Sequence, residues 1–207
     1  MILRLDDAAI ERLVEQARAG DRWAFAGLFE HFHEPVYRFV MSRVQRESDA
    51  EDLTQLVFVK ALEALPRYES RGIPFGGWLF RLARNAVIDF VRARREHADL
   101  ATAVERPAPD AGPAELAATR AEIAEVAAAL AVLTADQREV IALRFFAGLS
   151  ARDAAAAMGR QEGTIRGLQF RAIGTLRRQL GIDAEERIGS AAIGAGSVSH
   201  GGAGGRR

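Results

Sequence analysis

Apolar residues recur at three- and four-residue steps through most of the first 95 residues, which is the spacing of amphipathic helices. Residues that cap helix N-termini and residues that end helices divide this pattern into five predicted helices. They begin at Asp6 or Asp7, Asp21, Pro35, Asp49 and Trp78. Gly20 ends the first helix and Pro66 stops the fourth. The glycines and the proline of residues 67–77 then predict a loop before the fifth helix.

The same spacing returns in the C-terminal half of the chain. The predicted helices cover residues 114 to about 133, 135–147, 151–158, and 163 or 164 to 180. Ser150, with Asp153 three residues later, matches a capping box that has Asp in place of Glu. Gly159 ends that short helix, and a turn leads to the last one. Two helices joined by a tight, glycine-containing turn are typical of a helix-turn-helix.

Proline and glycine mark two segments that we expect not to pack. Three of the six prolines fall within seven residues, at Pro107, Pro109 and Pro113. The last 19 residues hold seven glycines. Such composition favours extended or disordered chain. We therefore predict an all-α protein, with two small helical domains at 6–95 and 114–182, a flexible acidic linker at 96–113 and a disordered Gly-rich tail at 183–207.

Composition excludes several functional classes. The chain has no cysteine, so disulfide scaffolds, cysteine zinc sites and thiol catalysis are ruled out. No run approaches about 18 consecutive apolar residues and no signal-peptide core follows Met1, so we expect a cytoplasmic protein without membrane insertion. The four histidines, His31, His33, His97 and His200, form no metal cluster, and no catalytic signature is present. We expect neither a cofactor nor enzymatic activity, and look for a binding function.

The formal net charge of zero hides local polarity. Residues 78–95 hold five arginines and one aspartate (5 − 1 = +4), and residues 160–178 hold five arginines and one glutamate (5 − 1 = +4). Between them, residues 99–125 hold six acids and two arginines (2 − 6 = −4). Two basic blocks on either side of an acidic spacer indicate two surfaces for a polyanion.

The last predicted helix has the length and charge to enter the major groove of duplex DNA. Its buried side would carry Ile165 and Ala172, and a polar stripe lies opposite. An Arg side chain there can pair with guanine through two hydrogen bonds. The candidate DNA-binding residues are Arg160, Thr164, Arg166, Gly167, Phe170, Arg171 and Arg178. The alternative is a solvated arginine face on a core helix.

Aromatic residues and arginines alternate before and within the fifth predicted helix. This mixture suits unpaired bases, which stack on aromatic rings while Arg holds the backbone. The candidates are Arg67, Tyr68, Arg71, Phe75, Trp78, Arg81, Arg84, Asn85 and Arg92. Taken alone, Trp78 fits core packing better.

The fourth helix carries a mixed outer face. Its inner stripe would hold Leu53, Leu56, Val57 and Ala61, while acid, amide and apolar groups alternate on the other side, at Asp52, Gln55, Val59 and Leu62. Such a mixture suits the groove of a protein partner. Burial of this helix on nearly all sides is the alternative.

Three segments together resemble the extracytoplasmic-function (ECF, group IV) sigma factors of bacterial RNA polymerase. They are DAEDLTQLVFVKAL (49–62), WLFRLARNAVIDFVRARR (78–95) and the segment 133–180, from LTADQREV to LRRQL. The resemblance implies that 66–95 captures and melts the −10 promoter element and that 150–178 reads the −35 element. It implies docking on the β′ clamp helices of core polymerase, with candidates Asp49, Glu51, Asp52, Gln55, Phe58, Val59 and Leu62. A contact with the β flap and an anti-sigma factor are further implied partners.

The sequence departs from the family pattern at three places: Thr134 replaces a usual Pro, Asp153-Ala154-Ala155 replaces Glu-Ile-Ala, and Gly167-Leu168-Gln169 replaces Ser-Arg-Leu. Glycine inside a helix costs about 1 kcal/mol relative to alanine. Two other functions stay open: a stand-alone helix-turn-helix regulator that binds a palindromic operator as a dimer, and an interaction protein without DNA binding.

Overall fold

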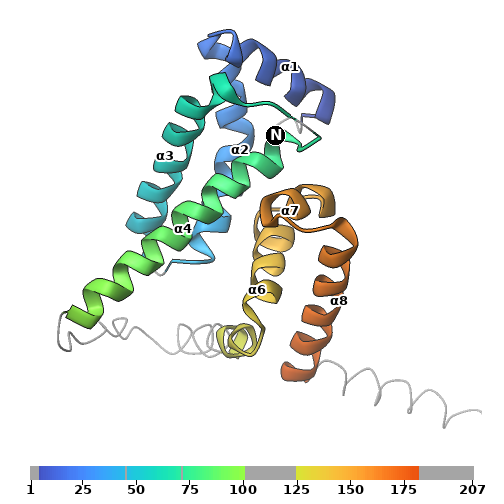
Figure 1. The fold of residues 1–207 in the computed structure, drawn as a ribbon. Coiled ribbons are helices and arrows are strands. Elements are labelled where there is room, and N and C mark those ends of the chain that lie inside the picture. The colour runs from blue at the N-terminus through green and yellow to red at the C-terminus, as the bar shows by residue number, and fades with distance from the viewer. Residues whose placement is uncertain (1–4, 45, 71, 101–124, 182–207) are drawn as a thin grey trace, which may run out of the picture. The chain divides into compact units, whose positions relative to one another are not determined.

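The computed structural model describes residues 5–44, 46–70, 72–100 and 125–181, and within these ranges every regular element is helical (Figure 1). This confirms the predicted all-α class. The elements are α1 (Asp7–Arg18), α2 (Arg22–Met41), α3 (Glu47–Ala64), the 3₁₀ turn η1 (Leu65–Arg67), α4 (Phe75–Leu100), α6 (Ala135–Ile141), the π-helical turn η2 (Ala142–Phe146), α7 (Ala151–Met158) and α8 (Glu162–Gln179). Residues 125–131 are also helical.

The chain divides into two compact units. One consists of residues 1–111 and 135–170, and the other of residues 112–134 and 171–207. The predicted Gly-rich tail lies outside the described residues, as does the predicted linker beyond residue 100. The domain boundaries drawn from the sequence stay a prediction.

The first two helices begin at the caps that the sequence predicts. The Asp6 carboxylate accepts a hydrogen bond from the Ala9 backbone N–H at 2.7 Å. Asp21 accepts from the backbone N–H groups of Trp23 and Ala24, at 2.8 and 3.3 Å. Between the helices, Gly20 takes a positive φ of 96°, which favours glycine.

The predicted helix start at Pro35 is wrong, because Pro35 lies inside the continuous helix α2. Proline in a helix interior loses a backbone hydrogen bond and costs about 3 kcal/mol. The buried apolar stripe of α2 continues past Pro35 without a break, on Leu28, Phe32, Val36, Phe39 and Val40. Burial of large apolar side chains contributes about 1.5–3 kcal/mol each, which offsets the cost of the proline.

Two other helix boundaries differ from the predicted ones. Helix α3 begins at Glu47, two residues before the predicted cap, and Asp49 instead pairs with Arg94 of α4 at 2.8 Å. Helix α4 begins at Phe75 and runs to Leu100. The first five residues of the predicted extended linker are therefore helical.

Helix α7 in the C-terminal half begins and ends at the predicted capping and helix-ending residues. Ser150 caps α7 by accepting from the Asp153 N–H at 3.0 Å, and its hydroxyl also donates to the Asp153 carboxylate at 2.6 Å. Gly159, with φ of 63°, ends α7 in the left-handed conformation. The π-helical turn η2, closed by a bond from the Ala147 N–H to the Ala142 carbonyl at 3.0 Å, was not predicted.

Candidate nucleic-acid interface

Helix α8 presents the predicted DNA-reading residues on its open side. Ile165 and Ala172 are fully buried, as predicted. Phe170 is 81% exposed, which is unusual for a large apolar side chain. The other candidates on this helix divide into exposed Thr164, Arg166, Arg171 and Arg178 and half-buried Gly167. The exposed side of α8 therefore combines cationic, hydroxyl and aromatic groups.

Short-range contacts hold the arginines around the start of α8. Arg166 pairs with Glu162 one turn earlier at 2.6 Å, and Arg160 pairs with Asp136 of α6 at 3.2 Å. Both pairs are exposed enough that water competes with them, and such pairs contribute only about 0–1 kcal/mol. These arginines can exchange a carboxylate for a phosphate at small cost.

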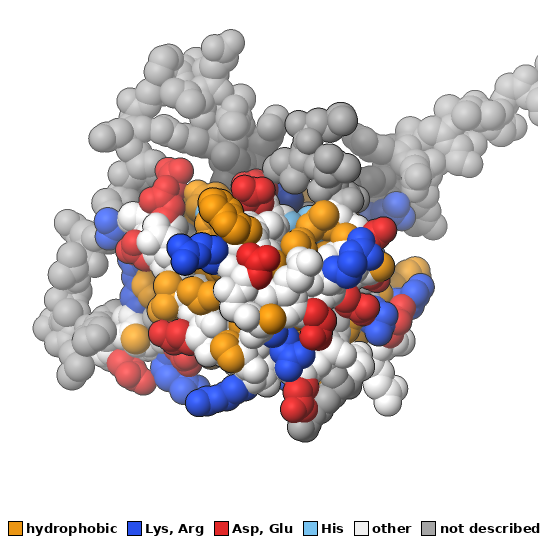
Figure 2. All heavy atoms as spheres, turned by 90° about the horizontal axis from the view of Figure 1, so that it is seen from above, with side chains coloured by type: hydrophobic (Ala, Val, Ile, Leu, Met, Phe, Trp, Pro, Cys, Tyr) orange, Lys and Arg blue, Asp and Glu red, His pale blue; other side chains and the backbone are white. Residues whose placement is uncertain are grey.

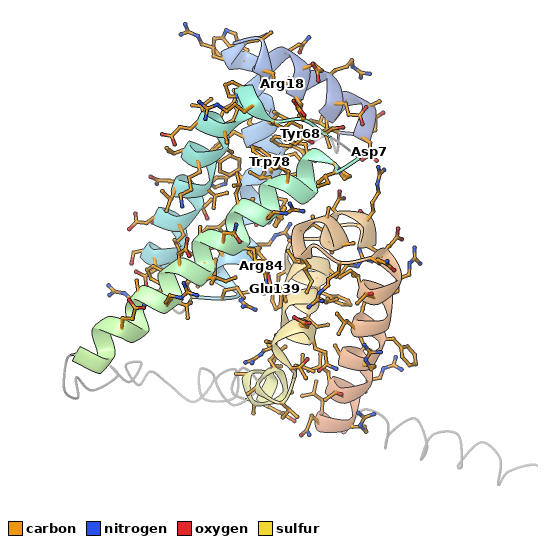
Figure 3. All side chains as sticks on the ribbon, viewed as in Figure 1. Asp7, Arg18, Tyr68, Trp78, Arg84 and Glu139 are labelled. Atoms are coloured by element: carbon orange, nitrogen blue, oxygen red, sulfur yellow. The ribbon has the colours of Figure 1, made fainter. Side chains whose placement is uncertain are left out.

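The aromatic residues before α4 form a cluster. Ring centroids lie 4.8 Å apart between Tyr68 and Trp78, 5.3 Å between Phe75 and Trp78, and 5.8 Å between Tyr68 and Phe75. Tyr68 donates its hydroxyl hydrogen to the Ile73 carbonyl at 2.9 Å, and burial raises the pKa of that hydroxyl. Figure 3 shows Tyr68 and Trp78 close to each other. Tyr68 and Phe75 are buried, so their rings hold the loop and are not presented to a base.

Polar contacts occupy the two arginines nearest the start of α4. Arg81 donates to the Ala156 carbonyl at 2.7 Å. Arg84 faces the buried carboxylate of Glu139, with 3.5 Å between the Arg84 Nε and a Glu139 oxygen (Figure 3). Farther along α4, Asn85 and Arg92 are exposed. Arg67 is exposed before the loop, and Arg71 lies outside the described residues.

Helix α3 has an exposed apolar strip beside its acidic residues. Val59 and Leu62 are 53% and 54% exposed, as their predicted outer position requires. Leu56, predicted in the inner stripe, is 40% exposed and joins them at a spacing of three residues. We call Leu56, Val59 and Leu62 the α3 strip. The predicted docking residues Glu51, Asp52 and Gln55 are exposed beside it.

Phe58 lies on the other side of α3. It is buried, and its ring packs edge-on against Phe29 with centroids 4.7 Å apart. Its side chain is therefore part of the core, while Leu56 is the apolar residue that the sequence interpretation left off the outer face. A helical-wheel argument alone cannot separate two residues at adjoining edges of a broad apolar arc.

The charged residues of the described chain do not gather into one large patch on the face that Figure 2 shows; acidic and basic side chains alternate there. No group of three or more His, Asp or Glu residues suited to a metal occurs among the described residues. Within the same ranges, no helix is long and apolar enough to cross a membrane.

Comparison with known families agrees with this geometry. The family model described as Sigma-70 region 2 matches residues 28–97, and the model Sigma-70, region 4 matches residues 129–178. The ECF RNA polymerase sigma factor BldN of Streptomyces coelicolor is 35% identical over 181 residues, which cover 86% of this chain and 69% of the relative. SigD of Mycobacterium tuberculosis is 37% identical over 177 residues, covering 83% and 84%.

Solved structures show the same likeness. The structure of CnrH in complex with the cytosolic domain of CnrY matches with a TM-score of 0.64 and 30% identity, over 84% of this chain and 99% of that chain. The sigma factor RpoE, solved with the anti-sigma factor NepR from Bartonella quintana, matches with a TM-score of 0.60 and 30% identity, over 77% and 98%. The chain belongs to the ECF sigma factors of the sigma-70 family. It is a non-enzymatic initiation factor that directs RNA polymerase to promoters, as the sequence interpretation predicted.

Proposed function

We propose that this sigma factor binds its promoter at two places, through side chains of different chemistry. The exposed side of α8 reads the −35 element as duplex, with Arg171 as the central base contact. The exposed part of α4, with Asn85 and Arg92, holds the opened −10 element. The observation that carries the duplex assignment is the exposure of Phe170 beside Arg171, because an aromatic ring can contact the thymine methyl group in the major groove.

We further propose that the α3 strip docks on the β′ clamp helices of core polymerase. Three apolar side chains flanked by Asp52 and Gln55 form an apolar centre with a polar rim, which is the composition of a transient protein interface. The proposal extends to a contact of the C-terminal helices with the β flap and to regulation by an anti-sigma factor, which the complex of RpoE with NepR supports. It places the protein in the cytoplasm with the polymerase.

The test is transcription in vitro by purified bacterial core polymerase, with and without the full chain, on a library of promoter fragments. We expect promoter-dependent product only with the chain present. Leu62→Glu places a charge in the α3 strip, so we expect it to weaken the binding of core polymerase by at least about tenfold. Binding is measured by fluorescence anisotropy of the labelled chain.

Glu63→Gln is the matched control, since Glu63 is exposed next to Leu62 but outside the α3 strip. It should bind core polymerase like the wild type. Equal binding by Leu62→Glu would show that polymerase docks elsewhere. Absence of any promoter-dependent product would contradict the proposed promoter contacts.

A further inference from the structure

Arg144 joins the turn before α7 to the middle of helix α8. Its Nε donates to the Gln169 side-chain carbonyl oxygen at 3.0 Å, and a second nitrogen of the same guanidinium donates to the Leu149 backbone carbonyl. A guanidinium holds its N–H groups in a rigid, planar fork. Two simultaneous bonds from one guanidinium therefore fix Gln169 relative to the turn.

The π-helical turn η2 positions Arg144 for this role. Leu143, just before it, is fully buried, whereas Phe145, just after it, is 55% exposed. Arg144 is half-buried between them, at the edge of the core. Helical turns of the π type are rare and occur frequently at functional sites. The turn gives Arg144 a place from which it reaches two other elements.

Gln169 lies on the buried side of α8. It comes one turn after Ile165 and three residues before Ala172, the two fully buried residues of this helix, and residues at these spacings share a face. Burial of apolar groups has no preferred direction, whereas a hydrogen bond weakens steeply when it is misaligned. The bond from Arg144 to Gln169 therefore fixes the rotation of α8 about its axis more sharply than the apolar contacts do.

This rotation decides where the proposed base contacts point. Phe170 and Arg171 directly follow Gln169, and both are exposed. The radius of a helix with its side chains is about 5–6 Å, so a rotation of about 20° moves a side-chain tip by about 2 Å. Donor–acceptor distances in hydrogen bonds spread over only about 0.5 Å. A small rotation is thus enough to break a contact with a base.

We propose that the bond between Arg144 and Gln169 is a positioning contact that sets the −35 sequence preference of this sigma factor. Arg144 acts through Gln169 on the direction of the exposed residues that follow it. The inference rests on the proposed function, because it requires that α8 reads duplex DNA. The bond also depends on a departure from the family pattern, since Gln169 replaces a Leu, which cannot accept a hydrogen bond.

Three substitutions test the bond itself. Gln169→Leu removes the acceptor and keeps a side chain of similar size. Arg144→Lys keeps the positive charge, but its single nitrogen cannot span Gln169 and Leu149 as the guanidinium fork does. Gln169→Glu retains acceptor oxygens for Arg144 and is the rescue variant. The matched control is Gln179→Leu, the same change at the exposed last residue of α8.

The measurement is a ratio of transcription in vitro by core polymerase with each full-length variant. One template is a strong promoter that the wild-type chain selects from the library, and the others carry single base changes in its −35 element. We expect Gln169→Leu and Arg144→Lys to lower the preference for the unchanged template about two- to tenfold, the range that one hydrogen bond supports. Gln169→Glu and Gln179→Leu should keep the wild-type ratio. A merely structural loss lowers transcription on all templates together and leaves the ratio unchanged.

The double variant shows whether the two side chains act as one unit. Arg144→Lys combined with Gln169→Leu should lower the ratio no further than the stronger single variant, because the bond can be lost only once. Additive losses would overturn the proposal, since Arg144 would then act without Gln169. Unchanged ratios in both single variants would overturn it as well. A wild-type chain that shows no −35 preference would instead contradict the proposed function of α8, so the two failures are distinguishable.

Discussion

The two basic segments, residues 78–95 within α4 and residues 160–178 at and within α8, carry the same excess charge along the sequence but present it differently. Arg81, Arg84 and Arg94 of α4 each contact a polar or charged group on another helix. On α8, Arg166 pairs only within its own helix, and Arg171 is exposed. Equal charge in the sequence therefore does not mean equal availability to DNA.

The difference follows from what each helix must do. Helix α4 is a core helix, with Leu79, Phe80 and Ala83 almost completely buried. Its arginines start at the edge of that core and reach neighbouring elements. Helix α8 fully buries Ile165 and Ala172 alone, and half of its 18 residues are exposed. A helix with one buried stripe suits insertion into a groove, whereas a core helix can offer only its free end or edge.

The largest effect is expected at Arg171 of α8. Arg171→Ala removes a side chain that can bond to guanine through two hydrogen bonds, a contact that discriminates by about 1–3 kcal/mol. We expect promoter-dependent transcription in vitro to fall by roughly 5- to 150-fold, because 1.4 kcal/mol corresponds to tenfold. Binding to core polymerase should not change.

Arg177→Ala supplies the comparison for this variant. Arg177 is exposed on the same helix but lies off the stripe of predicted base contacts. Its loss removes one positive charge with only a small effect on promoter choice. Loss of polymerase binding in Arg171→Ala would instead show that α8 serves the protein partner.

A smaller effect is expected at Asn85, an exposed polar side chain between the occupied arginines of α4. Asn85→Ala removes a possible hydrogen bond to a base edge, worth about 1 kcal/mol. Open-complex formation, followed by permanganate reactivity of unpaired thymines, should drop about fivefold. Asp89→Ala, one turn along the same helix, should show no loss. If both variants open DNA like the wild type, this part of α4 does not hold the melted strand.

The helical class and most helix ends could be predicted because they depend on neighbouring residues. Asp6, Asp21 and Ser150 bond to backbone groups two or three residues away, and such caps are visible in a sequence. The helix start predicted at Pro35 was wrong because the cost of a proline inside a helix depends on neighbouring residues, whereas the packing that offsets it is tertiary. Packing across the whole of α2 decides that the helix continues.

The candidate sites were predictable as residue types and not as surfaces. The exposure of Leu56 and the burial of Phe58 depend on which way α3 rolls against α2, and periodicity does not fix a rotation of that size. The pairing of Arg84 with Glu139 is still harder to predict from a sequence pattern. Glu139 is 55 positions away in the chain (139 − 84), and no local rule joins the two.

The smallest effect concerns the aromatic cluster that precedes α4. Tyr68→Phe keeps the ring and removes the hydrogen bond to the Ile73 carbonyl. The free energy of unfolding, measured in urea at neutral pH, should therefore fall by about 1 kcal/mol. Transcription should stay near the wild-type level, because the ring serves the loop and not a base. Tyr37→Phe, whose hydroxyl reaches Glu47 only at 3.5 Å, should lose less stability.

Stability measurements at alkaline pH distinguish a structural role of the Tyr68 hydroxyl from a contact with DNA. Burial raises the Tyr68 pKa in the folded chain above its ordinary value of 10.0, so the unfolded chain loses this proton first. The contribution of Tyr68 to stability is then complete below about pH 10 and is lost as the pH rises toward the folded pKa. Tyr68→Phe should show a shallower loss of stability over that range. A large fall in promoter opening by Tyr68→Phe at neutral pH, with stability unchanged, would mean that the hydroxyl contacts DNA, and α4 would then reach its strand through the loop before it.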